Sequence, residues 1–361
     1  MNHRKLAYIN GFEQIKRRAR VSRKTTTLGV IQPSLYNRKG MPEVNQIIQG
    51  DCIKVLNDGP EGWIDLVFAD PPFNIGYLYH GYNDEQKTED YLKFSEDWMT
   101  AVHRALKPTG SFYLAIGDEY AADLAVIARR QIGFHMRNWI IWHYTFGQQT
   151  KKMFAKSHTH ILYFTKSKPG AGLENITFNA DAVRVASARQ TTYADVRANP
   201  KGKLPDDTWY LRPQETPDEF FAGDSDTWNV SRVCGTFKER EGWHGCQMPI
   251  QVLDRIIKAS SNPGDIVLDP FNGSGTTVVS AALLDRKYVG IDQSKEYVEF
   301  ARKRLAHALT AAEKKGKVAA IEDPQRESRV LTATDAFGRK RVARKRAGAS
   351  MNGKKVLTKT A

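Results

Sequence analysis

The central part of the chain alternates between short apolar runs and segments in which apolar residues recur at helical spacing. The apolar runs predict strands at 46–51, 64–69, 111–116, 137–143, 158–165, 265–269 and 288–292. The helical spacing predicts helices at 52–57, 89–107, 118–130, 248–260, from the loop after 269 to about 285, and 294–309. This alternation predicts an α/β fold with a doubly wound, mostly parallel sheet that helices cover on both faces.

One long segment, 166–243, breaks the alternation. It is rich in Gly, Pro, Asp, Thr and scattered aromatic residues, and it shows no sustained period. We therefore predict a catalytic domain formed by 43–165 and 244–312, with 166–243 as an inserted, loop-rich lobe. The polar ends, 1–42 and 313–361, are predicted to be flexible.

The positive charge of the chain is concentrated at its two ends. The formal net charge is +14, yet 1–42 contains ten Lys or Arg and one acid, and 339–361 contains nine Lys or Arg and no acid. Basic arms of this kind add salt-sensitive, sequence-independent affinity for a phosphate backbone. Solubilising ends without a partner are the alternative interpretation.

Two classes of protein do not fit the sequence. No apolar run approaches the roughly 18 residues of a membrane span, and 1–20 lacks the apolar centre of a signal peptide, so a cytoplasmic protein without a membrane partner is expected. The three cysteines, Cys52, Cys234 and Cys246, have no CxxC spacing. They indicate small buried side chains rather than a disulfide framework or a zinc site.

A glycine-rich loop with the sequence DPFNGSGTT, 269–277, lies between a predicted strand and a predicted helix. Gly273 and Gly275 allow the backbone to turn sharply and approach a ligand. Val278 breaks the dinucleotide-binding pattern, and no Lys follows Gly275 as a phosphate-loop NTPase requires. Asp292 ends the next strand, where a carboxylate accepts hydrogen bonds from the two ribose hydroxyls of a nucleoside-like cofactor; a helix cap is the alternative.

A second loop, with the sequence DPPF, follows the strand predicted at 64–69. Asp70 offers only acceptors, and the prolines that follow have no N–H to donate, so carbonyl oxygens face the crevice. The Asp70 carboxylate and the Pro71 carbonyl are thus suited to hold the two N–H groups of a nucleobase amine. Phe73 offers a face on which a flipped base stacks. A capping Asp before a proline turn is the alternative.

Together these loops resemble the S-adenosylmethionine-dependent amino methyltransferases of DNA. The order of the loops, DPPF first and DPFNGSGTT about 200 residues later, resembles the circularly permuted β class of this family, and the resemblance covers roughly 45–310. It implies a Rossmann-like fold, S-adenosylmethionine as cofactor and no metal. It also implies a catalytic motif and a set of cofactor-binding residues: Asp70, Pro71, Pro72 and Phe73 for catalysis, and Asp51, Asp269, Phe271, Gly273, Gly275, Thr276 and Asp292 for the cofactor.

Some of these assignments have alternatives. Asp51 would contact the cofactor adenine, but it also has the position of a helix cap. Family members often have Gln-Lys-Pro before the helix that precedes the cofactor loop. This chain has Cys246-Gln247-Met248-Pro249 instead, so any role of that lysine is in doubt.

The resemblance also guides the choice of substrate. None of the cysteines follows a proline, which argues against methylation of cytosine at C5. An Asp at the head of the DPPF loop resembles the adenine-N6 enzymes, so the expected substrate is a flipped adenine in double-stranded DNA. The alternatives are an N4-cytosine enzyme, an RNA or protein-glutamine amino methyltransferase, or an inactive DNA-binding homologue. A cognate restriction endonuclease and a homodimer are further expectations from the family.

The lobe at 166–243 would then recognise the target sequence. Its basic residues would reach guanine edges or phosphates, although a solvated face is the alternative for each of them: Arg184, Arg189, Arg197, Arg212, Arg232 and Lys238. Tyr77 and Tyr79 would help to hold the flipped base. His158 and His160 alternate along a predicted strand, and without a third ligand they indicate packing or a phosphate contact rather than a metal site.

Overall fold

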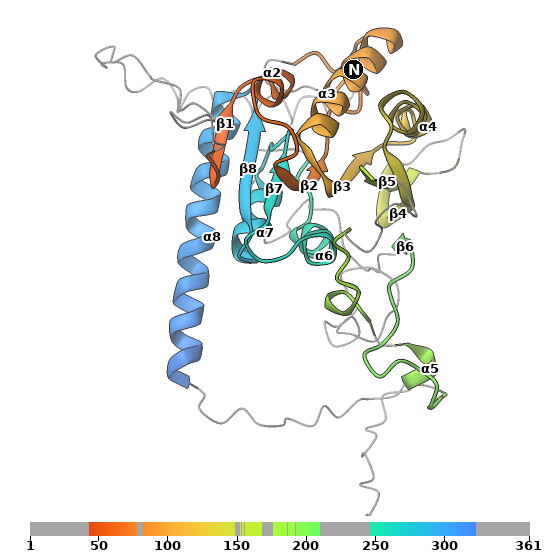
Figure 1. Cartoon of the computed structure of the whole chain (residues 1–361), viewed down its shortest axis with the longest axis vertical. Helices are drawn as coiled ribbons and strands as arrows, with labels where there is room; N and C mark the ends of the chain where they lie inside the picture. The colour runs from red at the N-terminus through yellow and green to blue at the C-terminus, as the bar shows by residue number, and fades with distance from the viewer. Residues whose placement is uncertain are drawn as a thin grey trace, which may run out of the picture. The chain divides into compact units, whose positions relative to one another are not determined.

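The computed structural model describes 43–77, 82–148, 152, 154, 156–167, 176–185, 187–191, 193–209 and 246–322 (Figure 1). The chain divides into two units, 1–310 and 311–361, and the described part of the second is the end of one helix. The basic end 1–42 and the segments 210–245 and 323–361 lie outside the described residues. No helix in the described ranges is long and apolar enough to cross a membrane.

A mostly parallel sheet forms the centre of the first unit. Its described strands follow the order β1-β8-β7-β2-β3-β5-β4-β6. The strands are β1 (Gln46–Gln49), β2 (Ile64–Ala69), β3 (Leu106–Ile116), β4 (His135–Gln148), β5 (Lys156–Thr165), β6 (Thr208–Trp209), β7 (Ile266–Asp269) and β8 (Lys287–Asp292). Among the described pairs, only those of β5 with β3 and with β4 are antiparallel.

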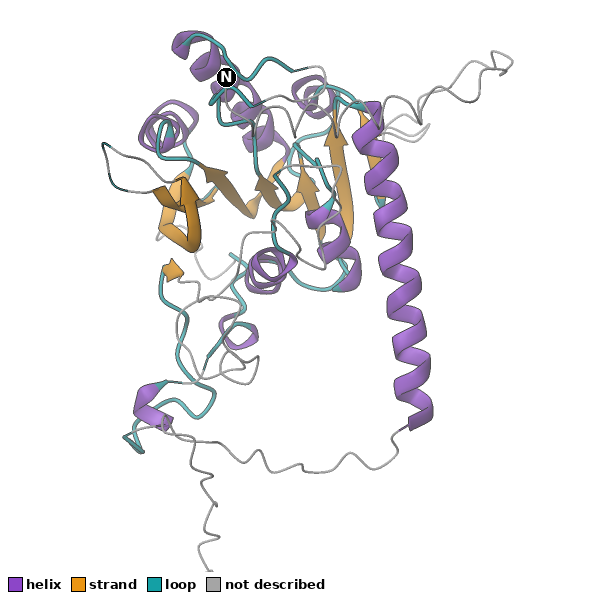
Figure 2. Cartoon of the chain, turned by 180° about the vertical axis from the view of Figure 1, so that it is seen from behind, coloured by secondary structure: helices purple, strands orange, loops and turns teal. Residues whose placement is uncertain are grey.

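Helices cover both faces of this sheet, as Figure 2 shows from behind. The main helices are α2 (Cys52–Asn57), α3 (Thr88–Ala105), α4 (Ala121–Val126), α6 (Ile250–Ser260), α7 (Thr276–Leu283) and α8 (Lys295–Glu322). Val67 and Ala69 of β2 pack in the core beneath α2, α3 and α4, whereas Leu66 and Phe68 pack in the core beneath α6. The two-sided burial explains why β2 is apolar at nearly every position. The predicted doubly wound α/β fold is confirmed.

The order of the strands also agrees with a circular permutation. The strand that ends in Asp269 lies between β8 and β2, and β1 pairs with the far side of β8. Five neighbouring parallel strands therefore end at the same edge of the sheet, although they come from two distant parts of the chain. A cut in a surface connection leaves such a sheet and its edge unchanged.

Two predicted boundaries in the first half are different in the structure. The helix predicted at 89–107 ends at Ala105, and β3 begins at Leu106 rather than at 111. Leu106 pairs with Ile64, and the register then shifts by a bulge that contains Pro108, which has no N–H to give to the ladder. The helix predicted at 118–130 is α4 followed by a π-helix, Ile127–Ile132, that ends at Gly133 with a positive φ of 101°.

The last helix is longer than the prediction. We expected a helix at 294–309, but α8 continues to Glu322. The sequence 310–322 is rich in Ala, Lys and Glu, which favour a helix even where no apolar face directs it.

The described part of the inserted segment is attached to the sheet and to α6. Ile141 of β4 pairs with Thr208 of β6. The Asn179 side chain donates to the carbonyls of Lys258 and Ser261 at 3.1 and 2.9 Å, which satisfies the end of α6. The insertion is thus anchored at both ends of its described part.

Candidate active site

The carboxyl ends of β2, β7 and β8 bring three acids to one edge of the sheet. Asp70 follows β2, Asp269 ends β7 and Asp292 ends β8. A cavity of about 220 Å³ lies at this edge. Its walls include most of the residues that the sequence predicts for the site: Asp70, Pro71, Pro72, Phe73, Asp269, Phe271, Gly273, Thr276 and Asp292. The two loops, about 200 residues apart in the chain, therefore form one cavity.

Asp292 holds the glycine-rich loop against the end of β8. Its two carboxylate oxygens accept from the backbone N–H groups of Gly273 and Ser294, both at 2.8 Å. The cap at Ser294 was the alternative interpretation of this residue, and the structure shows that contact together with the one to the loop. Each oxygen retains a second lone pair for a ligand. Burial raises the pKa of Asp292 to about 6.

Asp269 is the more deeply buried of the two acids. Asp269 is only 4% exposed, and one of its carboxylate oxygens accepts from the N–H of Phe271 at 3.0 Å. Burial, with a smaller contribution from the charge of Asp292, raises the pKa of Asp269 to about 7. Two adjacent acids with raised pKa values indicate a pocket suited to a cation or to hydrogen-bond donors.

The glycine-rich loop needs its glycines for different reasons. Gly275 has a φ of +77°, and a Cβ there would come within 2.9 Å of the Ala301 Cβ on α8, so this glycine allows loop and helix to pack closely. It does not line the cavity, in contrast to Gly273. A Cβ on Gly290 of β8 would come within 2.5 Å of the Asn272 Oδ1. The buried Asn272 amide, which has no hydrogen-bond partner among the described residues, therefore lies against the Gly290 backbone.

Phe271 forms part of an aromatic cluster between the cavity and α3. Its ring makes edge-to-face contacts with Trp98 and Phe94, at centroid distances of 5.1 and 6.3 Å. Trp98 is fully buried. The cluster fixes the phenyl ring at the cavity wall, because both of its partners are part of the same helix.

The DPPF loop is held from two sides. The hydroxyl of Tyr91 on α3 donates to the Pro72 carbonyl at 2.8 Å. A Cβ on Gly117, just after β3, would lie 3.2 Å from the Phe73 ring, so only a small residue there leaves room for the ring. The loop thus lies between α3 and the end of β3, with Asp70 and Phe73 at the cavity wall.

Asp51 is placed differently from the other predicted residues. Its exposed side chain accepts from the Ile53 N–H at 3.0 Å and caps α2. Gly50 and Cys52 on either side of it line the cavity, but Asp51 does not. Burial raises the pKa of the Cys52 thiol to about 12, as expected for a small buried side chain.

Further residues of the cavity wall were not in the predicted set. Tyr82, Phe94, Trp142, Thr159, Tyr297 and the run Cys246, Gln247 and Met248 all contribute to it. The residues that this chain has in place of the Gln-Lys-Pro pattern therefore line the cavity. Tyr77 lines the cavity, and Tyr79 is outside the described residues.

The two strand histidines have a third neighbour that the sequence pattern did not reveal. His158 and His160 each place Nε2 3.0 Å from the same Oδ1 of Asp118, and these are three potential metal ligands. However, the Trp139 indole N–H donates to Nδ1 of His160 at 2.8 Å. A neutral imidazole that accepts at Nδ1 carries its proton on Nε2, where a metal would have to bind. The arrangement therefore favours a hydrogen-bond network.

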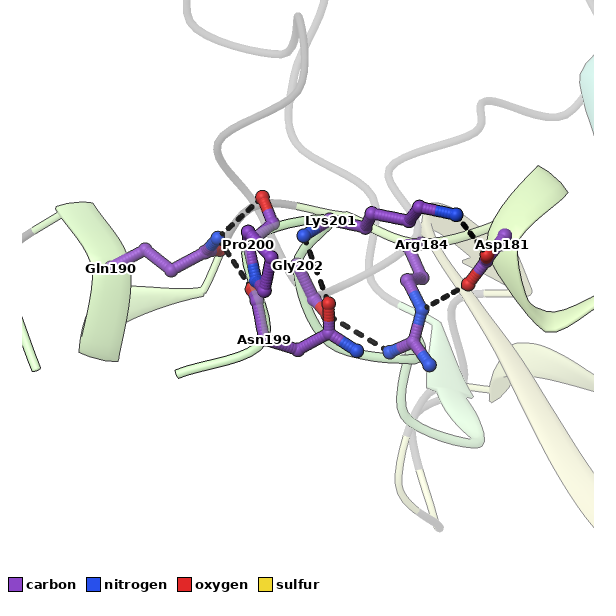
Figure 3. Close-up of polar contacts among 7 residues, drawn as sticks. All are labelled: Asp181, Arg184, Gln190, Asn199, Pro200, Lys201 and Gly202. Carbon is purple, nitrogen blue, oxygen red and sulfur yellow. Dashed lines mark hydrogen bonds and ion pairs between the residues drawn. The ribbon is translucent and has the colours of Figure 1, made fainter. Parts of the chain in front are cut away.

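Three of the basic residues predicted for the insertion form ion pairs with acids. Arg184 donates to Asp181 at 2.8 Å and to the Gly202 carbonyl at 2.9 Å, as Figure 3 shows, and its side chain is only 19% exposed. Arg189 and Arg197 both bind Asp195 but remain largely exposed. Arg212, Arg232 and Lys238 lie outside the described residues. Arg189 and Arg197 are thus better placed than Arg184 to reach a partner.

Comparisons with known proteins agree with this geometry. Residues 64–303 match the family described as DNA methylase. The type II methyltransferase M.HpaI of Haemophilus parainfluenzae is 36% identical over 260 residues, which cover 72% of this chain and 74% of that protein. The DNA adenine methyltransferase YhdJ of Escherichia coli (strain K12) is 35% identical over 266 residues, or 73% of this chain and 83% of that protein.

A solved structure shares the fold. The PvuII DNA methyltransferase, a cytosine-N4-specific enzyme, has a TM-score of 0.50 and 16% sequence identity, and the match covers 74% of this chain and 91% of that chain. At this identity the likeness concerns the fold alone. The family match covers more than half of the chain, and both relatives match over more than two thirds of their length. The chain therefore belongs to the DNA methylase family.

Proposed function

We propose that this DNA methyltransferase transfers a methyl group from S-adenosylmethionine to the exocyclic N6 of a flipped adenine in double-stranded DNA. The observation that carries the proposal is the single cavity whose walls contain both the DPPF loop and the glycine-rich loop. One loop provides acceptors for an amine, and the other provides a turn and carboxylates for a cofactor.

The residues of the cavity fit this cofactor. The carboxylates of Asp292 and Asp269 suit ribose hydroxyls and a positively charged sulfur, and the Phe271 ring gives an apolar surface. We assign Gly273 and Thr276 to the same cofactor region, with Gly275 allowing the loop to pack. We also assign Asp51 as a contact to the cofactor adenine, because it lies between Gly50 and Cys52, which line the cavity. When it is bound, S-adenosylmethionine supplies an electrophilic methyl group.

The DPPF loop then orients the amine. The Asp70 carboxylate accepts one N–H of the adenine amino group, and the Pro71 carbonyl accepts the other. Holding both N–H bonds draws the nitrogen toward tetrahedral geometry and frees its lone pair, which is otherwise delocalised into the ring. Pro72 and Phe73 complete the wall on which the base stacks. The Asp70 carboxylate or water accepts the proton that the methylated nitrogen releases.

Adenine is the favoured base for two reasons. Asp70 begins the catalytic loop, and YhdJ, which is 35% identical to this chain, is named an adenine methyltransferase. N4-methylation of cytosine, methylation of RNA and an inactive DNA-binding protein are the alternatives. We further propose that the segment 166–243 recognises the target sequence. A cognate endonuclease and a homodimer stay predictions from the family.

The proposal is tested with labelled S-adenosylmethionine and either plasmid DNA or total RNA as acceptor. We expect label in DNA, and N6-methyladenine on analysis of the nucleosides. The Asp70→Ala variant should lose this activity and keep cofactor affinity by calorimetry, because Asp70 contacts the amine. Asp97→Ala on α3 is the control, since Asp97 pairs with Lys93 at the surface. Label confined to RNA, or N4-methylcytosine as the product, would contradict the proposal.

A further inference from the structure

A buried acid lies beside the catalytic loop and has no role in the chemistry described above. Asp84, 14 residues after Asp70, is only 2% exposed. Among the described residues no Lys or Arg forms an ion pair with Asp84. A buried carboxylate without a cation must be balanced by hydrogen-bond donors.

The donors are backbone N–H groups of the segment that follows Phe73. Oδ1 of Asp84 accepts from Asn74 at 2.8 Å, and Oδ2 accepts from Ile75 at 3.1 Å and from Tyr77 at 2.8 Å. The remaining N–H, that of Gly76, donates to the Asp84 backbone carbonyl at 2.8 Å. All four consecutive N–H groups of 74–77 therefore bind one residue.

The backbone of 74–77 is shaped to present these donors. Asn74 and Gly76 have positive φ values of 56° and 76°, which turn successive N–H groups toward the same side. Such a concave arrangement of N–H groups binds anions, and here the anion is the Asp84 side chain. Hydrogen bonds to a carboxylate are about twice as strong as those between neutral groups.

A second set of contacts fixes the same segment to the start of α3. The Asn74 amide accepts from the Gln86 N–H at 2.7 Å and donates to the Gln86 carbonyl at 3.0 Å. It also donates to the Tyr120 hydroxyl at 3.0 Å. Asn74 thus tolerates the left-handed backbone and links the segment to its surroundings.

This segment contributes a wall of the cavity next to the catalytic loop. Phe73, Ile75 and Tyr77 line the cavity, and Ile75 is 66% exposed. The position of these side chains depends on the backbone that Asp84 holds. No amide that Asp84 binds comes from the glycine-rich loop.

We propose that Asp84 is a positioning residue that holds Phe73, Ile75 and Tyr77 in place for the flipped base. The inference rests on the proposed function. Asp84 would not touch the base or the cofactor, and it would act through the backbone of 74–77. Its loss should lower the methylation rate and base flipping while cofactor binding persists.

The test compares Asp84→Asn with the wild type and with Glu85→Gln, a neighbouring exposed acid. In the Asn variant one carboxylate oxygen becomes an NH₂ group, which faces backbone donors instead of accepting from them. We expect kcat to fall by about 10- to 100-fold, as for a small displacement of a reacting group. The affinity for S-adenosylmethionine should stay within about twofold, because Asp84 binds no amide of the glycine-rich loop. A 10-fold change in affinity would correspond to about 1.4 kcal/mol.

A fluorescent readout separates positioning from general stability. A duplex with 2-aminopurine at the target position, the site being taken from sequencing of modified DNA, should show less fluorescence increase with Asp84→Asn than with the wild type or Glu85→Gln. One outcome is that the wild type methylates DNA while the Asp84→Asn variant shows the same methylation rate and the same increase in 2-aminopurine fluorescence. That result would contradict this inference and leave the proposed function intact. Loss of cofactor binding in the variant would also overturn it, because that result indicates a general structural role. An inactive wild type would overturn the proposed function together with the inference.

Discussion

At the scale of single residues, the part of the cavity beside the glycine-rich loop contains two acids that burial keeps from full hydration. Asp292 is held by two backbone N–H groups, and Asp269 is almost completely buried beside it. Both pKa values are raised by burial, from 3.8 to about 6 for Asp292 and to about 7 for Asp269. A ligand that donates hydrogen bonds or carries positive charge relieves this cost, because it favours the ionised form.

Cofactor affinity and stability of the free protein should therefore respond to pH in opposite directions. As the pH falls from about 7.5 to about 5, protonation of Asp269 and then Asp292 should weaken S-adenosylmethionine binding, by up to about tenfold per pH unit for each group. The folded-state pKa values lie above the unfolded value, so the free energy of unfolding gains a contribution at low pH that is lost as the pH rises through about 6 to 7. Calorimetry and thermal melting over this range measure the two trends.

Asp292→Asn is the matched control for this pH dependence. The amide does not titrate, so the variant should bind the cofactor more weakly near neutral pH and show a shallower dependence on pH. The amino group of the cofactor titrates equally in both experiments. The difference between the wild type and the variant therefore reports the titration of Asp292. Equal slopes in the two proteins would mean that Asp292 does not face the cofactor.

At the scale of elements, the hydrophobic pattern predicted the central strands because they are apolar and buried; β7 and β8 end in an acid, and Asp70 directly follows β2. The strand 64–69 and the helix 52–57 have the predicted bounds. The pattern could not reveal Asp84 or Asp118, because their partners come from folding rather than from local spacing. The Asn-x-Gly run at 74–76 was the one local sign of the positive φ values that shape the 74–77 segment.

The hairpin of β4 and β5 shows how one neighbour can decide the chemistry of a cluster. Burial lowers the pKa of His160, which favours the neutral ring, and a neutral ring that accepts from the Trp139 indole at Nδ1 carries its proton on Nε2. Replacing Trp139 by Phe removes this donor. We expect Ni²⁺ to bind Trp139→Phe at least about tenfold more tightly than the wild type by calorimetry, the usual size of effects from groups that orient a ligand.

The His-Asp cluster itself provides the control. Adding His160→Ala to the Trp139→Phe variant should return the Ni²⁺ affinity to that of the wild type, because one of the three ligands is then missing. If the wild type already binds Ni²⁺ as tightly as Trp139→Phe, the indole does not determine the tautomer.

At the scale of the whole molecule, the two ends of the chain are basic, whereas the cavity is lined by acids. The chain has a net charge of +14, whereas its two ends, 1–42 and 339–361, contain 19 of the 54 Lys and Arg residues and one acid. The cavity, by contrast, is lined by three acids that suit a cationic cofactor and a donor amine. We therefore expect attraction to DNA to come mainly from parts of the chain that are separate in sequence from the catalytic loops.

Removal of both ends should thus weaken DNA binding without changing the chemical step. We expect a variant that consists of 43–338 to bind non-specific duplex more weakly at low salt. The slope of log K against log salt concentration should become shallower by about 0.9 for each phosphate that the protein no longer neutralises. At saturating DNA, kcat should remain close to that of the full chain, since every residue of the cavity wall is retained. Fluorescence anisotropy over a salt series, together with methylation rates, measures both quantities. An unchanged slope would show that the basic ends do not bind the phosphate backbone, and a fall in kcat at saturating DNA would show that they also act on the catalytic domain.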